Sequence, residues 1–237
     1  MKYSFTLETD KAEVLEGALR RVKTRRELAD ALGAPTRALR EYASDVLQQV
    51  ASQNCDLLLK SSAEIIDALD RPESFTRYNI LLVLDCFIPH HAPVVSKALY
   101  QLEDCLYDED SKIVRLEAFE VLCHFGATTE ARSKTVWGYL SEALRCYHGD
   151  PEYMQMLNYL TDMLQTGKVS ESVKEGVVRL FIFDAEQGKG MLQRRAQQII
   201  ALAPELQEKV KQEQAQEAVA RAAAATTTDD DDYDELD

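Results

Sequence analysis

The stretch "ADALGAPTRALR", from Ala29 to Arg40, returns further along the chain as "IDALDRPESFTR", from Ile66 to Arg77. Aspartate, alanine, leucine, proline and arginine recur in register at an offset of 37 residues. A third copy, "EDCLYDEDSKIVR" from Glu103 to Arg115, retains the aspartate and the leucine at that offset, and its arginine comes one residue later. Internal repetition with a period of roughly 38 residues is typical of α-solenoids, in which each copy supplies two helices.

The helices expected after these stretches keep the same register. Small and aliphatic residues line up across the three copies and are expected to face the core. The aligned sets are Ala43, Ile80 and Ala118; Val46, Val83 and Val121; and Leu47, Leu84 and Leu122. Apolar residues recur with helical spacing along the whole chain, and almost no segment alternates with period two, so the sequence predicts an all-α protein. A fourth and a fifth copy, which end near Gly167 and Ala203, are looser.

The segment "LYDEDSKIVRLEAFEVLCHFGA", from Leu106 to Ala127, resembles the HEAT repeat of the armadillo-like superfamily. In that family the first helix ends at an acidic turn, and the second begins with an apolar residue and an arginine, followed by a small residue and two core aliphatics. The resemblance covers about residues 28 to 203. It implies a right-handed α-α superhelix, a HEAT/armadillo-like solenoid of about five helix pairs with a C-terminal capping helix.

The breaks in the pattern predict the domain organisation. We expect an N-terminal extension at 1–9, a HEAT-like repeat domain at 10–203, a charged C-terminal helix at 204–224 and a disordered acidic tail at 225–237. Residues Asp229 to Asp237 carry seven acidic groups and no basic one, which is half of the net charge of -14, and such a segment buries too little apolar surface to fold. A first helix is expected at 10–31, and "PHHAP", Pro89 to Pro93, is expected to be a loop.

Composition disfavours several kinds of partner. Without its tail the chain is moderately acidic, which disfavours nucleic acid and anionic membranes. The longest apolar runs are too short to span a bilayer, so no membrane partner is expected. The five cysteines form no CxxC pair, and the N-terminus lacks a secretory signal. These features predict a cytoplasmic protein with free thiols.

Catalytic and metal-binding motifs are scarce. The sequence contains no glycine-rich phosphate loop, no HExxH, no GxSxG and no cysteine pair with metal-ligand spacing. His90 and His91 are adjacent, and adjacent side chains point in different directions, so they do not by themselves predict a metal site. Iron-binding HEAT enzymes carry His-Glu dipeptides, which this sequence lacks. We therefore expect no catalytic residue, no metal and no cofactor.

The second helices of a solenoid line its concave side, which is the natural place for a partner. If Ala118 faces the core, a 3.6-residue period places Glu117, Glu120 and His124 on the opposite face. The same register in the other copies completes the set of candidate partner-binding residues, which are Arg37, Tyr42, Asp45, Asn79, Glu117, Glu120 and His124. A mixed polar column that contains tyrosine is typical of a protein-binding groove, and a plain solvated helix face is the alternative.

Three arginines recur beside acidic turn residues. In HEAT proteins such a column resembles a structural ladder that links successive repeats. The ladder candidates are Arg40, Arg77, Arg115, Asp70 and Asp108.

The function predicted from these features is a non-enzymatic protein-protein interaction scaffold or adaptor with a protein partner; the oligomeric state stays open. One alternative is a nucleic-acid-acting HEAT protein similar to the glycosylases for alkylated bases, although the one tryptophan, Trp137, is expected in the core. The other is a DNA-binding regulator that uses the basic segment Arg20 to Arg40, where Ala29, Gly33 and Leu39 are spaced as in a helix-turn-helix. A repeat boundary accounts for the same residues, so we favour the scaffold.

Overall fold

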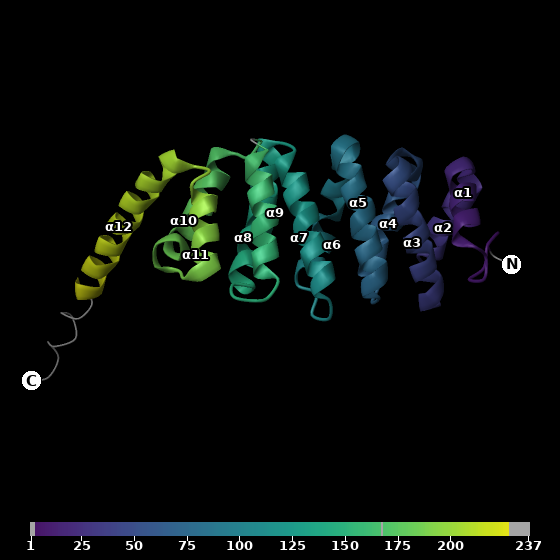
Figure 1. The fold of residues 1–237 in the computed structure, drawn as a ribbon, viewed down its shortest axis with the longest axis horizontal. Coiled ribbons are helices and arrows are strands. Elements are labelled where there is room, and N and C mark those ends of the chain that lie inside the picture. The colour runs from purple at the N-terminus through teal and green to yellow at the C-terminus, as the bar shows by residue number, and fades with distance from the viewer. Residues whose placement is uncertain (1–2, 167, 228–237) are drawn as a thin grey trace, which may run out of the picture. The chain divides into compact units, whose positions relative to one another are not determined.

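The computed structural model describes residues 3–166 and 168–227, and within these ranges the chain is helical and contains no strand (Figure 1). The all-α prediction is thereby confirmed. By its internal contacts the chain forms two compact units, Met1–Val169 and Ser170–Asp237.

The first unit is a series of paired helices. Helices α3, α5, α7 and α9 pack one against the next, and they stand side by side in Figure 1. Helix α2 packs against α3, α4 packs against α5, and α6 packs against α7. Helix α8 also packs against α7. The helices are α1 (Lys11–Arg20), α2 (Val22–Ala31), α3 (Arg37–Asn54), α4 (Ser62–Asp67), α5 (Ser74–Val95), α6 (Leu99–Leu106), α7 (Lys112–Ala127), α8 (Glu130–Cys146) and α9 (Tyr153–Gln165). Short 3-10 helices lie between some of them: η1 (Cys55–Ser61), η2 (Ala68–Asp70) and η3 (Ser96–Ala98).

The core of this unit lies where the repeat alignment places it. All nine aligned residues on α3, α5 and α7 are fully buried. Each buried valine, leucine or isoleucine side chain stabilises the fold by about 1.5 to 3 kcal/mol relative to an exposed one. Because α3, α5 and α7 carry these residues at the same positions, stacking the repeats produces one continuous core.

The expected helix at 10–31 is wrong, because the structure has two helices there. Arg21 has extended backbone angles (φ -121°, ψ 120°), which end α1 and begin α2. The side chain of Arg25 donates to the carbonyl of Ala18 across the break (2.6 Å). No glycine or proline marks this position, so the break depends on contacts that local sequence patterns do not reveal.

The expected loop at Pro89 to Pro93 is also wrong. Helix α5 continues through both prolines, and His91 is its only residue with non-helical angles (φ -131°, ψ 33°). Proline removes a backbone donor and crowds the preceding turn, which bends a helix without necessarily ending it. The segment is therefore a kink inside α5.

The segment Ser74–Leu106, which includes α5 and α6, is long and apolar enough to cross a membrane by length and composition, with a mean hydropathy of 1.3 in its most apolar window. Half of that window is buried inside the protein. Because α5 packs against both α3 and α7, the apolar character of this segment has a structural explanation as a core helix.

The second unit contains α10 (Glu171–Gln187), α11 (Gly190–Ile200) and α12 (Pro204–Thr227). Helix α10 contacts both α11 and α12, so the charged last helix belongs with the fifth pair, whereas the sequence suggested a boundary at 203/204. Lys209 of α12 pairs with Glu175 of α10 (2.7 Å), and Arg179 pairs with Glu175 and Glu213. The predicted disordered tail at 225–237 is wrong in its first three residues, because α12 continues through Thr227. The rest of the predicted tail, 228–237, lies outside the described residues.

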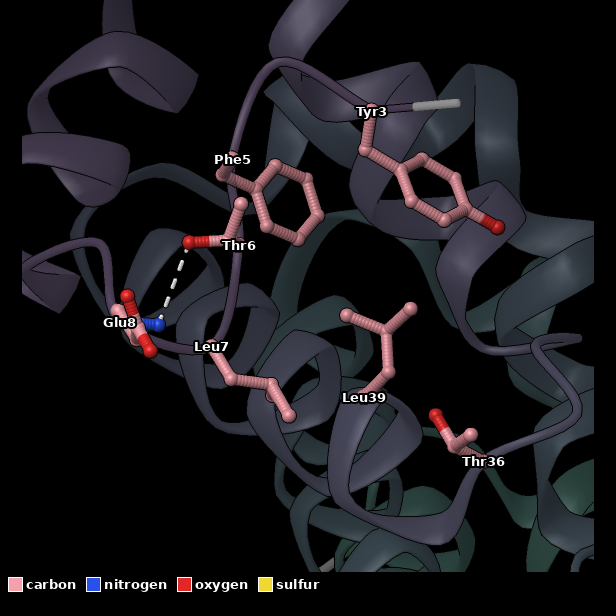
Figure 2. Close-up of a pocket in the computed structure, with 7 residues that line it drawn as sticks. All are labelled: Tyr3, Phe5, Thr6, Leu7, Glu8, Thr36 and Leu39. Carbon is pink, nitrogen blue, oxygen red and sulfur yellow. Dashed lines mark hydrogen bonds between the residues drawn. The ribbon is translucent and has the colours of Figure 1, made fainter. Parts of the chain in front are cut away.

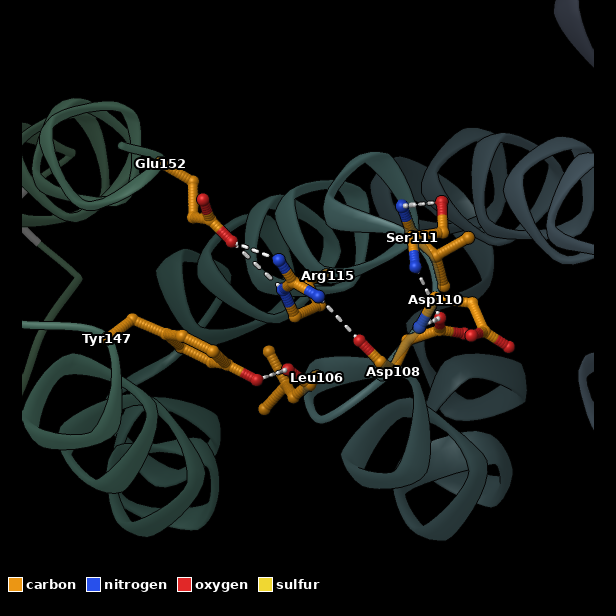
Figure 3. Close-up of polar contacts among 8 residues, drawn as sticks. Leu106, Asp108, Asp110, Ser111, Arg115, Tyr147 and Glu152 are labelled. Atoms are coloured by element: carbon orange, nitrogen blue, oxygen red, sulfur yellow. Dashed lines mark hydrogen bonds and ion pairs between the residues drawn. The ribbon is translucent and has the colours of Figure 1, made fainter. Parts of the chain in front are cut away.

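Ion pairs connect successive second helices, and Arg115 shows the arrangement most fully (Figure 3). Its Nε donates to Glu152 Oε1 (3.0 Å), and its Nη2 forms a further hydrogen bond with the same oxygen. Its Nη1 donates to the backbone carbonyl of Asp108 (2.6 Å), and the guanidinium carbon lies 5.3 Å from the centroid of the Tyr147 ring. Burial favours a higher pKa for Glu152, but the hydrogen bonds and charge of Arg115 outweigh it and lower that pKa.

Arginine–carboxylate pairs at the same place occur in the two preceding repeats, and the pair of Arg40 includes the hydrogen bond to a backbone carbonyl. Arg40 Nε donates to Glu73 Oε2 (3.1 Å), and Arg40 Nη1 donates to the carbonyl of Ala34 (2.7 Å). Arg77 Nη2 lies 2.5 Å from Asp108 Oδ2. Each arginine lies near the start of one second helix, and its carboxylate lies at or just before the start of the next. We call these three arginine–carboxylate pairs the arginine ladder.

Asp70 does not belong to the arginine ladder. It is an exposed residue at the end of η2, and no ion pair to it occurs among the described residues. Glu73 and Glu152, at the N-caps of α5 and α9, hold the carboxylates that pair with Arg40 and Arg115. A carboxylate at the helix start lies beside the preceding second helix, whereas the turn that contains Asp70 points to solvent.

We expect Arg115→Ala to lower the free energy of unfolding by about 3 to 5 kcal/mol, because it leaves the carboxylate of Glu152 buried without its cation. Chemical denaturation followed by circular dichroism measures the change. The matched control is Arg37→Ala, because Arg37 is 69% exposed and pairs with Glu41 on its own helix, an interaction worth about 0.5 kcal/mol or less. Equal, small losses in both variants would remove the arginine ladder as a source of stability.

Candidate functional site

Polar and acidic side chains gather on the face that α5, α7 and α9 share. On α7, residues Glu117, Glu120 and His124 follow one another at spacings of three and four, so they lie on one side of that helix. Helix α5 contributes carboxylate and phenol groups, and α9 contributes a second phenol. We call this group the Glu117 cluster; its members are Tyr78, Asp85, Glu117, Glu120, His124 and Tyr159.

His124 connects two helices of the cluster. Its Nδ1 lies 2.7 Å from Asp85 Oδ1 on α5, and its Nε2 lies 3.9 Å from Glu120 Oε1 one turn earlier on α7. The hydrogen bond to Asp85 is the main reason that the pKa of His124 is raised, and the nearby carboxylates add to it. His124 is thus held close to its partners while half of its surface still faces solvent.

Glu117 is the most perturbed acid of the cluster. Burial, followed by the negative charges of Glu120 and Asp85, raises the pKa of Glu117 from its ordinary value of 4.5 to about 7. The positive charge of His124 opposes this shift but does not cancel it. A carboxyl group whose neighbours are mostly carboxylates and whose charge is poorly solvated is a place where an added cation is favourable.

Two tyrosines flank these acids. Burial and then a hydrogen bond to Glu120 raise the pKa of Tyr159 to about 12. The pKa of Tyr78 is raised by burial and by the charges of Glu117 and Glu120. Both phenols therefore remain neutral, and their half-buried rings present flat, rigid surfaces beside the carboxylates.

An apolar pocket adjoins the cluster at the start of α5 and α7. It has a volume of about 410 Å³, and its lining residues are Ser74, Phe75, Tyr78, Ser111 and Ile113. Phe75 is 46% exposed and Ile113 is 55% exposed, so two large apolar side chains face solvent from neighbouring helices. Tyr78 belongs to both the pocket and the Glu117 cluster, and Ile113 lies about one turn before Glu117. The acidic and apolar features therefore form one surface.

Two residues predicted for the partner-binding face are buried instead. Tyr42 donates to the carbonyl of Thr9 (2.9 Å) and stacks on Phe5, so the N-terminal segment covers it. Asn79 Nδ2 donates to Ser44 Oγ (3.1 Å) between α3 and α5. A helical period separates core from non-core positions, but it does not separate the solvent-facing side from the sides that touch the neighbouring second helices.

The other two predicted residues on α3 are engaged locally. Arg37 pairs with Glu41 on its own helix (2.8 Å), and Asp45 pairs with Lys11 of α1. The structure does not bring either of them into the Glu117 cluster. Sequence reasoning missed Tyr78, Asp85 and Tyr159. The spacing of 39 residues between Asp85 and His124 is close to the repeat period and is the signal that could have found Asp85.

Part of the basic segment Arg20 to Arg40 is paired with carboxylates, whereas Arg21 and Arg26 are exposed and form no ion pair among the described residues. Arg20 pairs with Glu16 (2.8 Å), Lys23 pairs with Glu27 (3.7 Å), and Arg40 belongs to the arginine ladder. Helix α3, the second helix of the helix-turn-helix pattern, packs against both α1 and α5. Trp137, which was expected in the core, is partly buried on α8.

A second pocket lies under the N-terminal segment (Figure 2). Its volume is about 450 Å³, and its lining residues are Tyr3, Phe5, Thr6, Leu7, Glu8, Thr36 and Leu39. Glu8 is its single ionisable acid, so the pocket lacks the converging charged groups that mark the Glu117 cluster. It offers little basis for specific recognition.

Comparison with known proteins identifies the fold. No protein-family model and no curated protein matches the chain. Among solved structures it is similar to a designed armadillo repeat protein in complex with the peptide (KR)4, with 12% identity, a TM-score of 0.62, and coverage of 81% of this chain and 90% of that one. It is also similar to computationally designed armadillo repeat proteins for modular peptide recognition (12%, TM-score 0.60, 81% and 91%) and to a further designed armadillo repeat protein (12%, 0.59, 83% and 96%).

These similarities, with the stacked helix pairs, show that the chain has an armadillo/HEAT-like α-solenoid fold. Proteins of this class typically serve as scaffolds for protein interaction, and the fold is typically non-enzymatic. At this level of identity the similarity concerns the fold alone.

We expect Glu117→Gln to raise the free energy of unfolding above that of the wild-type protein at pH 8 and to change it much less at pH 5. A carboxyl group whose folded pKa is raised from 4.5 to about 7 opposes folding once it ionises, so the wild-type protein loses stability as the pH rises between these values. Glutamine does not ionise, and after allowance for solvent screening the gain at pH 8 is about 1 to 2 kcal/mol. Denaturation at both pH values measures it. The same gain at pH 5 would show that packing, and not ionisation, is responsible.

Proposed function

We propose that this protein is a non-enzymatic adaptor that binds a basic segment of a partner protein at the Glu117 cluster. The observation that carries the proposal is the group of three carboxyl side chains, Asp85, Glu117 and Glu120, gathered on adjacent helices around a single histidine. A lysine or arginine side chain placed there would relieve the mutual repulsion of these acids and return Glu117 to its ionised form.

The surroundings of the acids suit a peptide better than an isolated cation. Tyr78 and Tyr159 offer aromatic faces on which a guanidinium can lie, and rigid tyrosines contribute contact area at low conformational cost. The pocket of Phe75 and Ile113 offers a place for an apolar side chain a few residues from the basic one. A solenoid presents such features along successive second helices, which suits a segment that runs across the repeats.

The complex of one structurally similar protein suggests which basic ligand to test. The designed armadillo repeat protein with a TM-score of 0.62 is in complex with (KR)4, a peptide of alternating lysine and arginine. We infer that the acidic second-helix surface of this chain recognises the same chemistry.

The free thiols favour a cytoplasmic location, as proposed from the sequence.

The two alternatives have weaker support. Sequence-specific DNA binding would need exposed, unpaired basic groups around α3, where Arg40 is tied to Glu73 and Arg37 to Glu41. A glycosylase-like activity would need an acid beside aromatics on a basic surface, whereas Tyr78 and Tyr159 lie among carboxylates. We therefore keep the scaffold as the conclusion.

The binding test uses the full chain and a fluorescently labelled (KR)4 peptide in a titration followed by anisotropy. We expect Glu120→Lys to weaken binding by roughly tenfold or more, because it replaces an attractive charge with a repulsive one. The control, Glu64→Lys, makes the same charge change on an exposed position of α4 and is expected to alter affinity by less than about twofold. Equal losses in the two variants would mean that the peptide senses only net charge.

The same titration has an expected pH dependence. Between pH 6 and pH 8 Glu117, whose pKa is about 7, loses its proton, and the added negative charge favours a cationic peptide. The hydrogen bond to Asp85 raises the pKa of His124, so its loss of positive charge acts in the same direction but comes at a higher pH than in a free histidine. Affinity is expected to rise several-fold over this range in the wild-type protein and to rise less in Glu117→Gln. An affinity that is independent of pH would place the peptide away from this cluster.

A further inference from the structure

A second group of chemically active side chains lies at the kink of α5. It consists of Cys55 and Asp56, which begin η1, and His91, which lies in α5. One ligand atom from each residue, the cysteine Sγ, a carboxylate oxygen and an imidazole nitrogen, lies within 4.8 Å of the other two. Neither the Glu117 cluster nor the arginine ladder uses these residues.

The local backbone explains how the three side chains meet. Asn54 accepts a hydrogen bond from the backbone N–H of Asp56 (3.1 Å), which fixes the turn from α3 into η1 and places Cys55 and Asp56 together. In α5, His91 lies between Pro89 and Pro93 and departs from helical angles. The neighbouring His90 is exposed, whereas the ring of His91 is turned to Asp56, with Nε2 2.5 Å from Oδ1.

We propose that Cys55, Asp56 and His91 form a binding site for Zn²⁺ that joins η1 to the kink of α5. Thiolate, imidazole and carboxylate are the three side-chain ligand types that zinc takes in proteins. Zinc–ligand distances of about 2.0 to 2.3 Å in a tetrahedral site separate the ligand atoms by about 3.3 to 3.8 Å. The three ligand atoms lie within 4.8 Å of one another, and His91 Nε2 and Asp56 Oδ1, now 2.5 Å apart, must separate by about 0.8 Å to share the ion. Side-chain rotations that move these atoms by about 1 Å complete the site.

The charges of the site also suit the ion. The thiolate of Cys55 and the carboxylate of Asp56 together neutralise Zn²⁺, and His91 binds as neutral imidazole through Nε2. On binding, the thiol proton passes to solvent, and the imidazole proton resides on Nδ1. Asp56 is largely exposed, so the fourth coordination position opens to water. The site does not rest on the proposed peptide function, and either can fail alone.

The sequence alone predicted no metal site because the side chains of the adjacent residues His90 and His91 point in different directions. The missing ligands come from the preceding repeat. Asp56 and His91 are 35 residues apart, which is close to the repeat period, so stacking of α3 and α5 brings them together. A zinc ion at this position would couple two successive repeats.

The test is a titration of the full-length reduced chain with Co²⁺, a spectroscopic substitute for zinc, followed by displacement with Zn²⁺. We expect one ion per chain, a thiolate-to-cobalt charge-transfer absorption, its loss on addition of Zn²⁺, and a higher melting temperature with Zn²⁺. Cys55→Ser should abolish the charge-transfer absorption, and His91→Gln should weaken Zn²⁺ binding by about 100-fold.

Two control variants make the test specific. His90→Gln changes the adjacent, exposed histidine, and Cys146→Ser changes an exposed cysteine on another helix. Both should bind Zn²⁺ with wild-type affinity and retain the cobalt spectrum. Failure of the folded wild-type chain to bind at micromolar concentration would overturn the proposal. So would a cobalt spectrum that survives Cys55→Ser, or equal loss of binding in His90→Gln and His91→Gln.

Discussion

A buried guanidinium must be met by a carboxylate, and in this protein the carboxylate comes from the next repeat. Arg40 and Arg115 each leave the start of one second helix and reach an acid at the N-cap of the following one. The desolvation of these charges is tolerable only when the partners are in place, so the pairs fix how far one second helix is displaced along the next. That displacement also decides which side chains of α5, α7 and α9 lie opposite one another, including those of the Glu117 cluster.

The repeat pattern predicted the fold because the core repeats with the chain. Val46, Val83 and Val121 are buried in the same way since each repeat meets the same neighbours. The details that the sequence did not reveal depend on contacts between repeats. The partner of Arg40 is Glu73, one repeat later, although Glu73 also lies four residues before Arg77, which suggests a pair within one helix. The break between α1 and α2 at Arg21 likewise depends on tertiary contacts, and at His91 the structure has a kink inside α5 where the sequence suggested a loop.

The candidate site could be predicted only in part for a related reason. Helical periodicity selected Glu117, Glu120 and His124 correctly as one face of α7, because that choice needs a single helix. It also selected Tyr42 and Asn79, which the N-terminal segment and the neighbouring helix cover. The surface is a property of several repeats together, and its composition follows from which side chains remain uncovered after stacking. The three ligands of the proposed zinc site are also distributed over two repeats.

The one-repeat spacing of these interactions has a consequence for how the first unit folds. Its connecting contacts join residues about one repeat apart, such as Arg40 with Glu73 and Asp85 with His124, separated by 33 and 39 residues. Relative to the length of the chain, such contacts close short loops, and low contact order favours fast folding. Each of the three arginine-ladder pairs joins two adjacent repeats. Folding can therefore start at more than one place along the unit and spread to its neighbours, as in a one-dimensional array.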